Sequence, residues 1–137
     1  MAFTLDSIVP WGRSLEEYVR MFNLTETELT LKILGCGDGP ASFNREMQQR
    51  GYTVVSIDPI YQFRAAQIRS RIDAAYAEIM DQLLKNKDDY LWDEISSPEE
   101  LGRIRMTAMR EFLADFEQGK QAGRYLAEEL PSLSFRD

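Results

Sequence analysis

The chain of 137 residues contains no histidine and a single cysteine, Cys36. One cysteine cannot form an internal disulfide, which fits a reducing compartment. A zinc site or a Cys–His nucleophile pair needs side chains that this composition does not supply, so we expect no metal centre. No apolar run is long enough to cross a bilayer, and no secretory pattern opens the chain. The sequence therefore predicts a soluble, cytoplasmic protein with no membrane partner.

Basic residues are also few. Lysine and arginine total 16 against 23 aspartates and glutamates, which gives a net charge of −7 and a pI of about 4.7. This balance argues against a broad nucleic-acid surface. Hydrophobic residues make up 44% of the chain, enough for the core of one domain.

The most informative stretch is residues 31–40, where a short apolar run meets three glycines on alternate positions, Gly35, Gly37 and Gly39. Residues 41–50 then follow a helical pattern. The stretch predicts a strand over 29–34, a tight turn and a helix. Glycines in such a turn allow positive φ and let a ligand lie against bare main chain. We interpret it as a loop for a nucleotide-type cofactor.

A second strand is predicted over 52–57, and it stops at Asp58 and Pro59. Strand, glycine turn, helix and strand make a βαβ half-unit with a right-handed crossover. An acid at the end of the second strand can accept both hydroxyls of a ribose. Asp58 could instead cap the segment that follows, since Asp-Pro commonly opens a turn. Its place after a β-rich run favours the ribose role.

These two motifs resemble those of class I S-adenosylmethionine-dependent methyltransferases. The resemblance implies S-adenosylmethionine as cofactor and a small-molecule site at the turn. It further implies that an acid after the third strand, Glu128 or Glu129, contacts the adenine amino group, and that Trp11, Arg13 and Tyr18 cover the cofactor. The expected cofactor-binding residues are Gly35, Cys36, Gly37, Asp38, Gly39, Asp58, Pro59 and Glu128.

Two features depart from the family pattern. Ile33 stands where the family has an acid, two residues before the first glycine, and Asp38 is the nearest carboxylate. The family links its second and third strands by one modest helix, whereas this chain has a two-helix insertion over 59–123. Its first helix follows three-and-four apolar spacing, and its second begins at Ser97 with a capping-box pattern.

The predicted fold class is α/β, a partial Rossmann-like methyltransferase sheet of three parallel strands in the order 3-2-1. We expect a single partial domain that ends before a fourth strand, with an unpaired sheet edge that could pair two copies into a homodimer. Its parts are an N-terminal arm and helix (1–28), the cofactor-binding strand-loop-helix-strand (29–58), the helical insertion (59–123), and the third strand and loop (124–137).

The predicted function is methyl transfer to an unidentified acceptor, with catalytic residues unknown and the activity of the chain by itself open. One alternative is a nucleotide- or dinucleotide-binding oxidoreductase fragment, although Pro40 stands where a dinucleotide fingerprint has its last glycine. Another is a non-catalytic helical interaction module on a degenerate Rossmann base. A redox or nucleophilic role for Cys36 is disfavoured, because no histidine or nearby strong base activates it.

Overall fold

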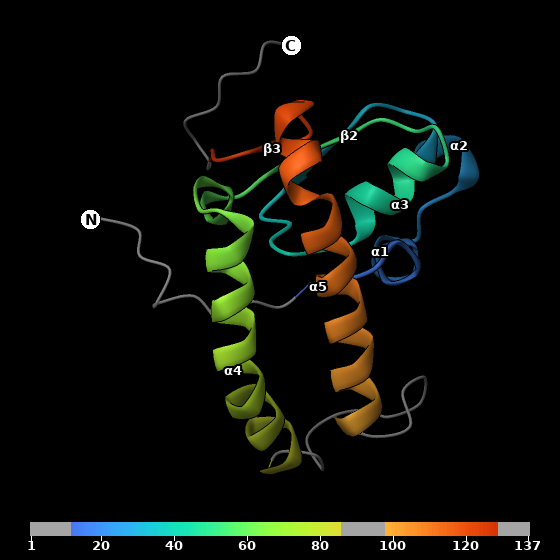
Figure 1. Ribbon diagram of the computed structural model, residues 1–137. Helices are drawn as coiled ribbons and strands as arrows, with labels where there is room; N and C mark the ends of the chain where they lie inside the picture. The colour runs from blue at the N-terminus through green and yellow to red at the C-terminus, as the bar shows by residue number, and fades with distance from the viewer. Residues whose placement is uncertain (1–11, 86–97, 129–137) are drawn as a thin grey trace.

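The computed structural model describes residues 12–85 and 98–128. Figure 1 shows a small sheet with helices packed beside it and two long helices running away from it. The helices are α1 (Leu15–Phe22), α2 (Glu26–Leu29), α3 (Phe43–Gln49), α4 (Ala65–Lys85) and α5 (Pro98–Gln121), with a short 3-10 helix η2 (Pro59–Gln62). The strands are β1 (Ile33–Cys36), β2 (Val54–Ile57) and β3 (Tyr125–Leu126).

The three strands are parallel and lie in the order β1-β2-β3. The α/β class and the predicted strand order are therefore confirmed. The expected start of the first strand at residue 29 is wrong, because residues 26–29 form α2. Thr25 and Glu28 close a capping box there, which satisfies helix N–H groups and stabilises a helical turn.

The helical insertion between the second and third strands is confirmed by α4 and α5. The insertion begins with the short helix η2, and α4 starts only at Ala65. Asp58 caps η2 by accepting from the Ile60 N–H, and Pro59 occupies its first turn. The predicted cap at Ser97 lies outside the described residues.

The core consists of two clusters. The aromatic cluster joins η2, α4, α5 and β3 and comprises Ile60, Tyr61, Ile68, Ile72, Met109, Phe112, Leu113, Phe116 and Tyr125. The turn-side cluster joins α1, α2, α3 and β2 and comprises Leu15, Leu29, Phe43, Met47 and Val54. Val54, of the turn-side cluster, and Ser56 lie two positions apart on β2 and so point to the same face of the sheet. Tyr125, of the aromatic cluster, pairs in register with Ser56, so both clusters lie on that face.

The other face of β1 is open. Leu34 is 41% exposed and Cys36 is exposed, so β1 is not buried on both faces as parallel strands commonly are. In the described part of the chain β1 is an edge strand. Ile33 and Gly37 donate their N–H groups to β2-side carbonyls, so the N–H groups of Leu34 and Cys36 point away from β2.

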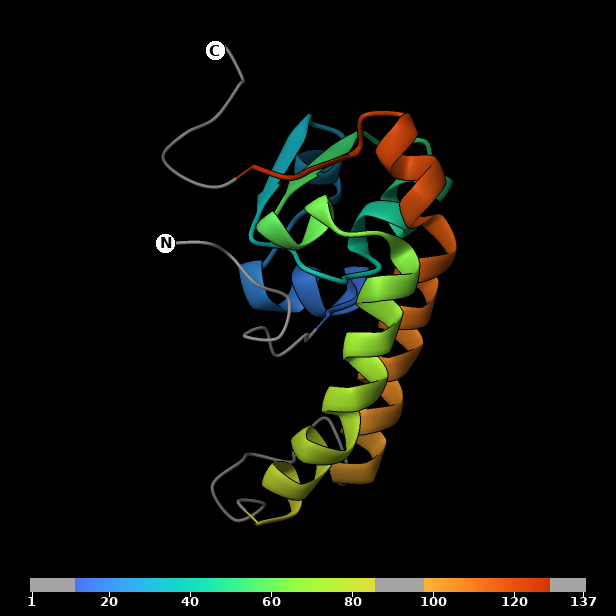
Figure 2. The same ribbon diagram turned by 60° about the vertical axis from the view of Figure 1, so that its left-hand side comes forward.

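The pair α4 and α5 packs along its length and extends well beyond the sheet, as Figure 2 shows from the side. Gly102 lets the two helices approach closely, because a Cβ there would lie 2.5 Å from the Met80 sulfur. No helix within the described ranges has the length and apolar character to span a membrane.

Candidate functional site

The glycine turn has the backbone geometry that the sequence predicts. Gly37 and Gly39 adopt φ values of 70° and 59°. A Cβ on Gly37 would have no heavy atom within 4 Å, so the turn presents bare main chain to open space. Gly35 serves a different purpose, since a Cβ there would lie 1.9 Å from a carboxylate oxygen of Asp38. The first glycine therefore makes room for a side chain of its own turn.

Asp38 is turned inward and joins three elements. It accepts hydrogen bonds from the Tyr18 hydroxyl on α1, at 2.9 Å, and from the Ser56 hydroxyl on β2, at 2.6 Å. Burial raises the pKa of Asp38, and the hydrogen bonds from Ser56 and Tyr18 oppose that rise. Burial also raises the pKa of Tyr18, and the negative charge of Asp38 adds to the effect. Sequence reasoning did not predict this contact between α1 and the turn.

Asp58 stands at the end of β2 and ties that strand to the glycine turn. One carboxylate oxygen accepts from the Gly39 N–H at 3.0 Å, and the other accepts from the Ile60 N–H at 2.9 Å. Asp58 is thus the helix cap that the sequence left open as an alternative. Its carboxylate oxygens each carry two lone pairs, so these bonds leave acceptor capacity for a ligand hydroxyl.

The N-terminal arm also reaches the turn. A Cβ on Gly12 would lie 2.0 Å from the Pro40 carbonyl oxygen, so glycine is required for the approach. The Ser42 N–H donates to the Arg13 carbonyl oxygen at 3.1 Å. Sequence analysis singled out Arg13 only through the family resemblance and missed Gly12. No pattern around Gly12 in the sequence indicated this contact.

An open pocket of about 470 Å³ lies along β1 on the α1 side of the turn. Its lining includes the first half of the turn, from Gly35 to Asp38, together with Arg13 and Tyr18. Asp58 is outside this lining. The glycine turn therefore separates the pocket, on the β1 side, from Asp58, on the β2 side.

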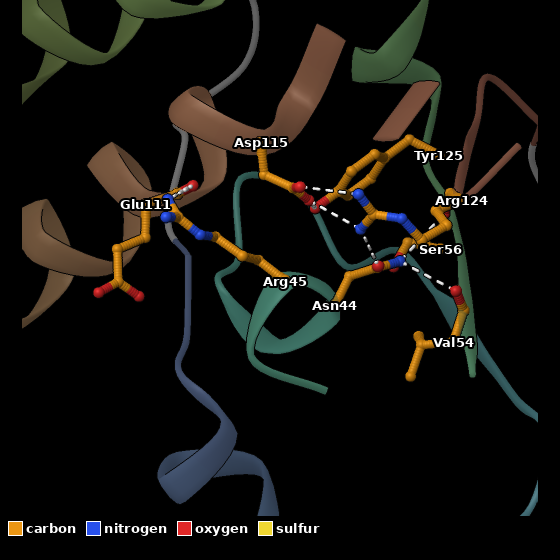
Figure 3. Close-up of polar contacts among 8 residues, drawn as sticks. All are labelled: Asn44, Arg45, Val54, Ser56, Glu111, Asp115, Arg124 and Tyr125. Carbon is orange, nitrogen blue, oxygen red and sulfur yellow. Dashed lines mark hydrogen bonds and ion pairs between the residues drawn. The ribbon is translucent and has the colours of Figure 1, made fainter. Parts of the chain in front are cut away.

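A second polar cluster lies away from the turn, where α3, α5 and β3 meet (Figure 3). Arg124 donates to both carboxylate oxygens of Asp115, at 2.7 and 2.8 Å, and to the amide oxygen of Asn44 at 2.8 Å. The Asn44 amide in turn donates to the Ser56 hydroxyl and to carbonyl oxygens of Val54 and Arg124. Each group has a partner within the protein, so we assign this cluster a structural role.

The structure brings most of the predicted residues to one edge of the sheet. Gly35 to Gly39, Asp58 and Pro59 follow the carboxyl ends of β1 and β2. Glu128 follows β3 at the same edge, and its N–H donates to the Leu126 carbonyl oxygen, which also accepts from the Asp58 N–H. Trp11 and Glu129 lie outside the described residues. No group of three or more His, Cys, Asp or Glu within 12–85 and 98–128 is placed to hold a metal ion.

Comparison with known proteins gives one relative of undetermined role. An uncharacterized protein of Methanocaldococcus jannaschii is 31% identical over 135 residues, which cover 97% of this chain and 60% of that protein. The chain thus spans about three fifths of the length of the curated relative it matches. No family model matches the chain. No solved structure matches it either.

Proposed function

We propose that this domain binds S-adenosylmethionine and supplies the cofactor half of a methyltransferase. The observation that carries the proposal is the link between the two motifs. A turn with positive φ at Gly37 and Gly39 donates its Gly39 N–H to Asp58, the acid that ends the next parallel strand. Ligands of open α/β sheets bind at this carboxyl edge.

The residues fit an adenosyl ligand by their chemistry. Asp58 would accept from the ribose hydroxyls, and the bare main chain at Gly37 admits close approach of the ligand. Glu128 stands at the same edge for the adenine amino group. When bound, the cofactor supplies a sulfonium methyl group for in-line displacement by an acceptor. The protein contributes alignment and exclusion of water, and the catalytic residues stay unassigned.

Ligand-induced stabilisation tests the proposal directly. Thermal unfolding should be followed with S-adenosylhomocysteine and, separately, with NAD. A ligand that binds only the folded state stabilises it by about 2.7 kcal/mol at a hundredfold excess over Kd. We expect a clear rise in Tm with S-adenosylhomocysteine and none with NAD. A rise with NAD alone would support the dinucleotide alternative.

The ribose role of Asp58 needs a variant that keeps the cap. Asp58→Ala would remove the bonds to Gly39 and Ile60, at a cost of about 1 kcal/mol for a lost cap. Asp58→Asn can keep the cap, because its amide oxygen can accept from the Ile60 N–H, but its NH2 group replaces the oxygen that accepts from Gly39 and weakens acceptance from the ribose. We expect Asp58→Asn to reduce the rise in Tm that S-adenosylhomocysteine causes. Asp73→Asn, an exposed position on α4, should leave this rise unchanged. An unchanged shift in Asp58→Asn would remove the ribose assignment.

A non-catalytic interaction module is the second candidate. The projection of α4 and α5 away from the sheet favours it, as does Ile33 at the position of the family's acid. It predicts no Tm change with any nucleoside ligand. The same titration therefore separates it from the methyltransferase proposal.

A further inference from the structure

Asp38 lies inside the glycine turn and uses both of its carboxylate oxygens within the protein. It is only 8% exposed, and Gly35 leaves the room that its side chain occupies. Oδ1 accepts from the Tyr18 hydroxyl at 2.9 Å, and Oδ2 accepts from the Ser56 hydroxyl at 2.6 Å. Hydrogen bonds to an ionised acceptor are the stronger ones. A carboxylate held from both sides in this way fixes the shape of its own turn.

The Tyr18 hydroxyl is held in place by α5 of the helical insertion. Glu17, the preceding residue on α1, forms an ion pair with Arg105 of α5, and the two side chains are only 11% and 7% exposed. The other oxygen of Glu17 closes the capping box of α1 by accepting from the Ser14 N–H at 3.1 Å. Because α1 has only eight residues, a contact that fixes Glu17 also fixes the direction of Tyr18.

The Ser56 hydroxyl is held by a second chain of contacts that also begins on α5. Asp115 of α5 pairs with Arg124, which donates to the Asn44 amide oxygen at 2.8 Å. The Asn44 amide donates to Ser56 Oγ at 3.0 Å, and Ser56 donates onward to Asp38. The polar cluster of Figure 3 therefore reaches the glycine turn through Ser56. Asp38 is thus linked to α5 at both of its carboxylate oxygens.

These two chains of contacts connect the helical insertion to the turn that would carry the ligand. A residue can change the affinity of a site through intervening contacts without touching the ligand. On the basis of the proposed function, we propose that Arg105 of α5 is a positioning residue for the adenosyl ligand. Through its ion pair with Glu17 it holds Tyr18 against Asp38, and so keeps the glycine turn in the shape that receives the ligand.

Calorimetric titration with S-adenosylhomocysteine measures the coupling between Arg105 and Tyr18. We expect Arg105→Gln to weaken binding by about three- to thirtyfold, the range for residues that act through intervening contacts. Arg105→Lys keeps a cation beside Glu17 and should recover part of the loss. Tyr18→Phe removes the hydroxyl but keeps the ring against Phe43, and it should weaken binding to a similar extent. Added to Tyr18→Phe, Arg105→Gln should cost little more, because the contact through which Arg105 acts is already lost.

Met109→Ala is the matched control on the same helix. Met109 is 2% exposed and belongs to the aromatic cluster, so its truncation loosens the packing of α5 and leaves the Arg105 ion pair intact. Binding by the folded variant should be unchanged. Unchanged affinity in Arg105→Gln overturns the positioning role, as do additive losses in the double variant or an equal loss in Met109→Ala.

Circular dichroism checks that each variant is folded. If Arg105→Gln is not, Glu17→Gln decides by the same double variant with Tyr18→Phe. The amide oxygen of Glu17→Gln can accept from the Ser14 N–H and keep the capping box, while its NH2 group replaces the oxygen that pairs with Arg105. Failure of the unsubstituted chain to bind S-adenosylhomocysteine overturns the proposed function, and this role with it. Binding that is equal in every variant overturns only the positioning role of Arg105.

Discussion

The two core clusters face the same side of the sheet and are both buried, but they differ in composition and in what lies beside them. In the aromatic cluster four rings from three elements contact one another, with centroid distances of 5.0 to 5.9 Å. Tyr61 and Phe112 in it are fully buried. The turn-side cluster borders exposed apolar side chains instead, with Phe22 61%, Leu31 59% and Met21 54% exposed.

The two clusters hold different parts of this small domain together. The aromatic cluster fixes α4 and α5 to η2 and β3 and so holds the carboxyl edge of the sheet. The turn-side cluster holds α1 and α3 against β1 and leaves the pocket beside them open. We therefore expect the larger aromatic cluster to contribute more of the stability, while the candidate binding surface borders the turn-side cluster. Four experiments, each with its own substitutions, test the structure around these clusters.

The largest effect is expected in the aromatic cluster. Phe112→Ala removes a fully buried ring that contacts Tyr61, Phe116 and Tyr125. We expect a loss of about 4 kcal/mol in the free energy of unfolding, measured by urea denaturation. Phe22→Ala, the matched change beside the turn-side cluster, should cost less than about 1 kcal/mol, because its ring stays largely exposed. Equal costs would contradict the stabilising role of the buried ring.

The polar cluster of Asp115 and Arg124 is the next test. Burial favours a higher pKa for Asp115, but hydrogen bonds from Arg124 and Tyr125 outweigh it, and the pKa lies below its ordinary value. The ionised Asp115 carboxylate therefore contributes stability above the pKa that it has in the unfolded chain, about 3.9. This contribution is lost as the pH falls through the lower pKa that it has in the folded protein.

We expect Asp115→Asn to cost about 3 kcal/mol at pH 7, because it leaves the Arg124 charge poorly paired. The variant should also lose less stability than the unsubstituted chain between pH 5 and pH 2, since one source of acid sensitivity is gone. Urea denaturation at several pH values measures both effects. The exposed Asp81→Asn serves as control; an identical pH dependence in Asp115→Asn would contradict the assignment.

Two glycines allow backbone strain to be separated from ligand contact. Gly37 and Gly51 both have positive φ, 70° and 83°, and neither has a heavy atom within 4 Å of a built Cβ. Alanine at either should cost about 1 kcal/mol of stability, from backbone strain alone. Gly37→Ala should also weaken binding of S-adenosylhomocysteine, whereas Gly51→Ala, at the end of α3, should not. Equal affinity in both variants would place the ligand away from the turn.

The smallest effect on stability is expected at the open edge of β1. The N–H groups of Leu34 and Cys36 point away from β2, and Leu34 is exposed, so two copies can pair through this strand. We expect concentration-dependent dimers by size-exclusion chromatography with light scattering. Leu34→Lys should abolish them through like-charge repulsion and change the stability of the monomer by at most about 0.5 kcal/mol. A monomer at all concentrations would remove the homodimer proposal.

Much of the fold was predictable because its signals are local. The capping box of Ser14 and Glu17, for example, is a local sequence pattern, and it starts α1 at Leu15. The limits of β1 were mispredicted, because Leu29 and Leu31 resemble strand positions while the capping box before them favours a helical turn. The Asp-Pro pair indicated that Asp58 could act as a cap. Sequence analysis preferred the ribose role, because the sequence alone does not show where the following N–H groups point.

Local sequence patterns predict an apolar strand, alternate glycines that permit positive φ, a helix, and a second strand that ends in an acid. Each depends on residues a few positions apart. The contacts between residues far apart in the chain are seen only in the tertiary structure. Asn44 and Arg124 are 80 positions apart and meet in one hydrogen-bond network. Asp38 faces Tyr18 rather than solvent, and Gly12 brings Arg13 to the turn, because chain packing brings together groups whose sequence separation carries no signal of contact.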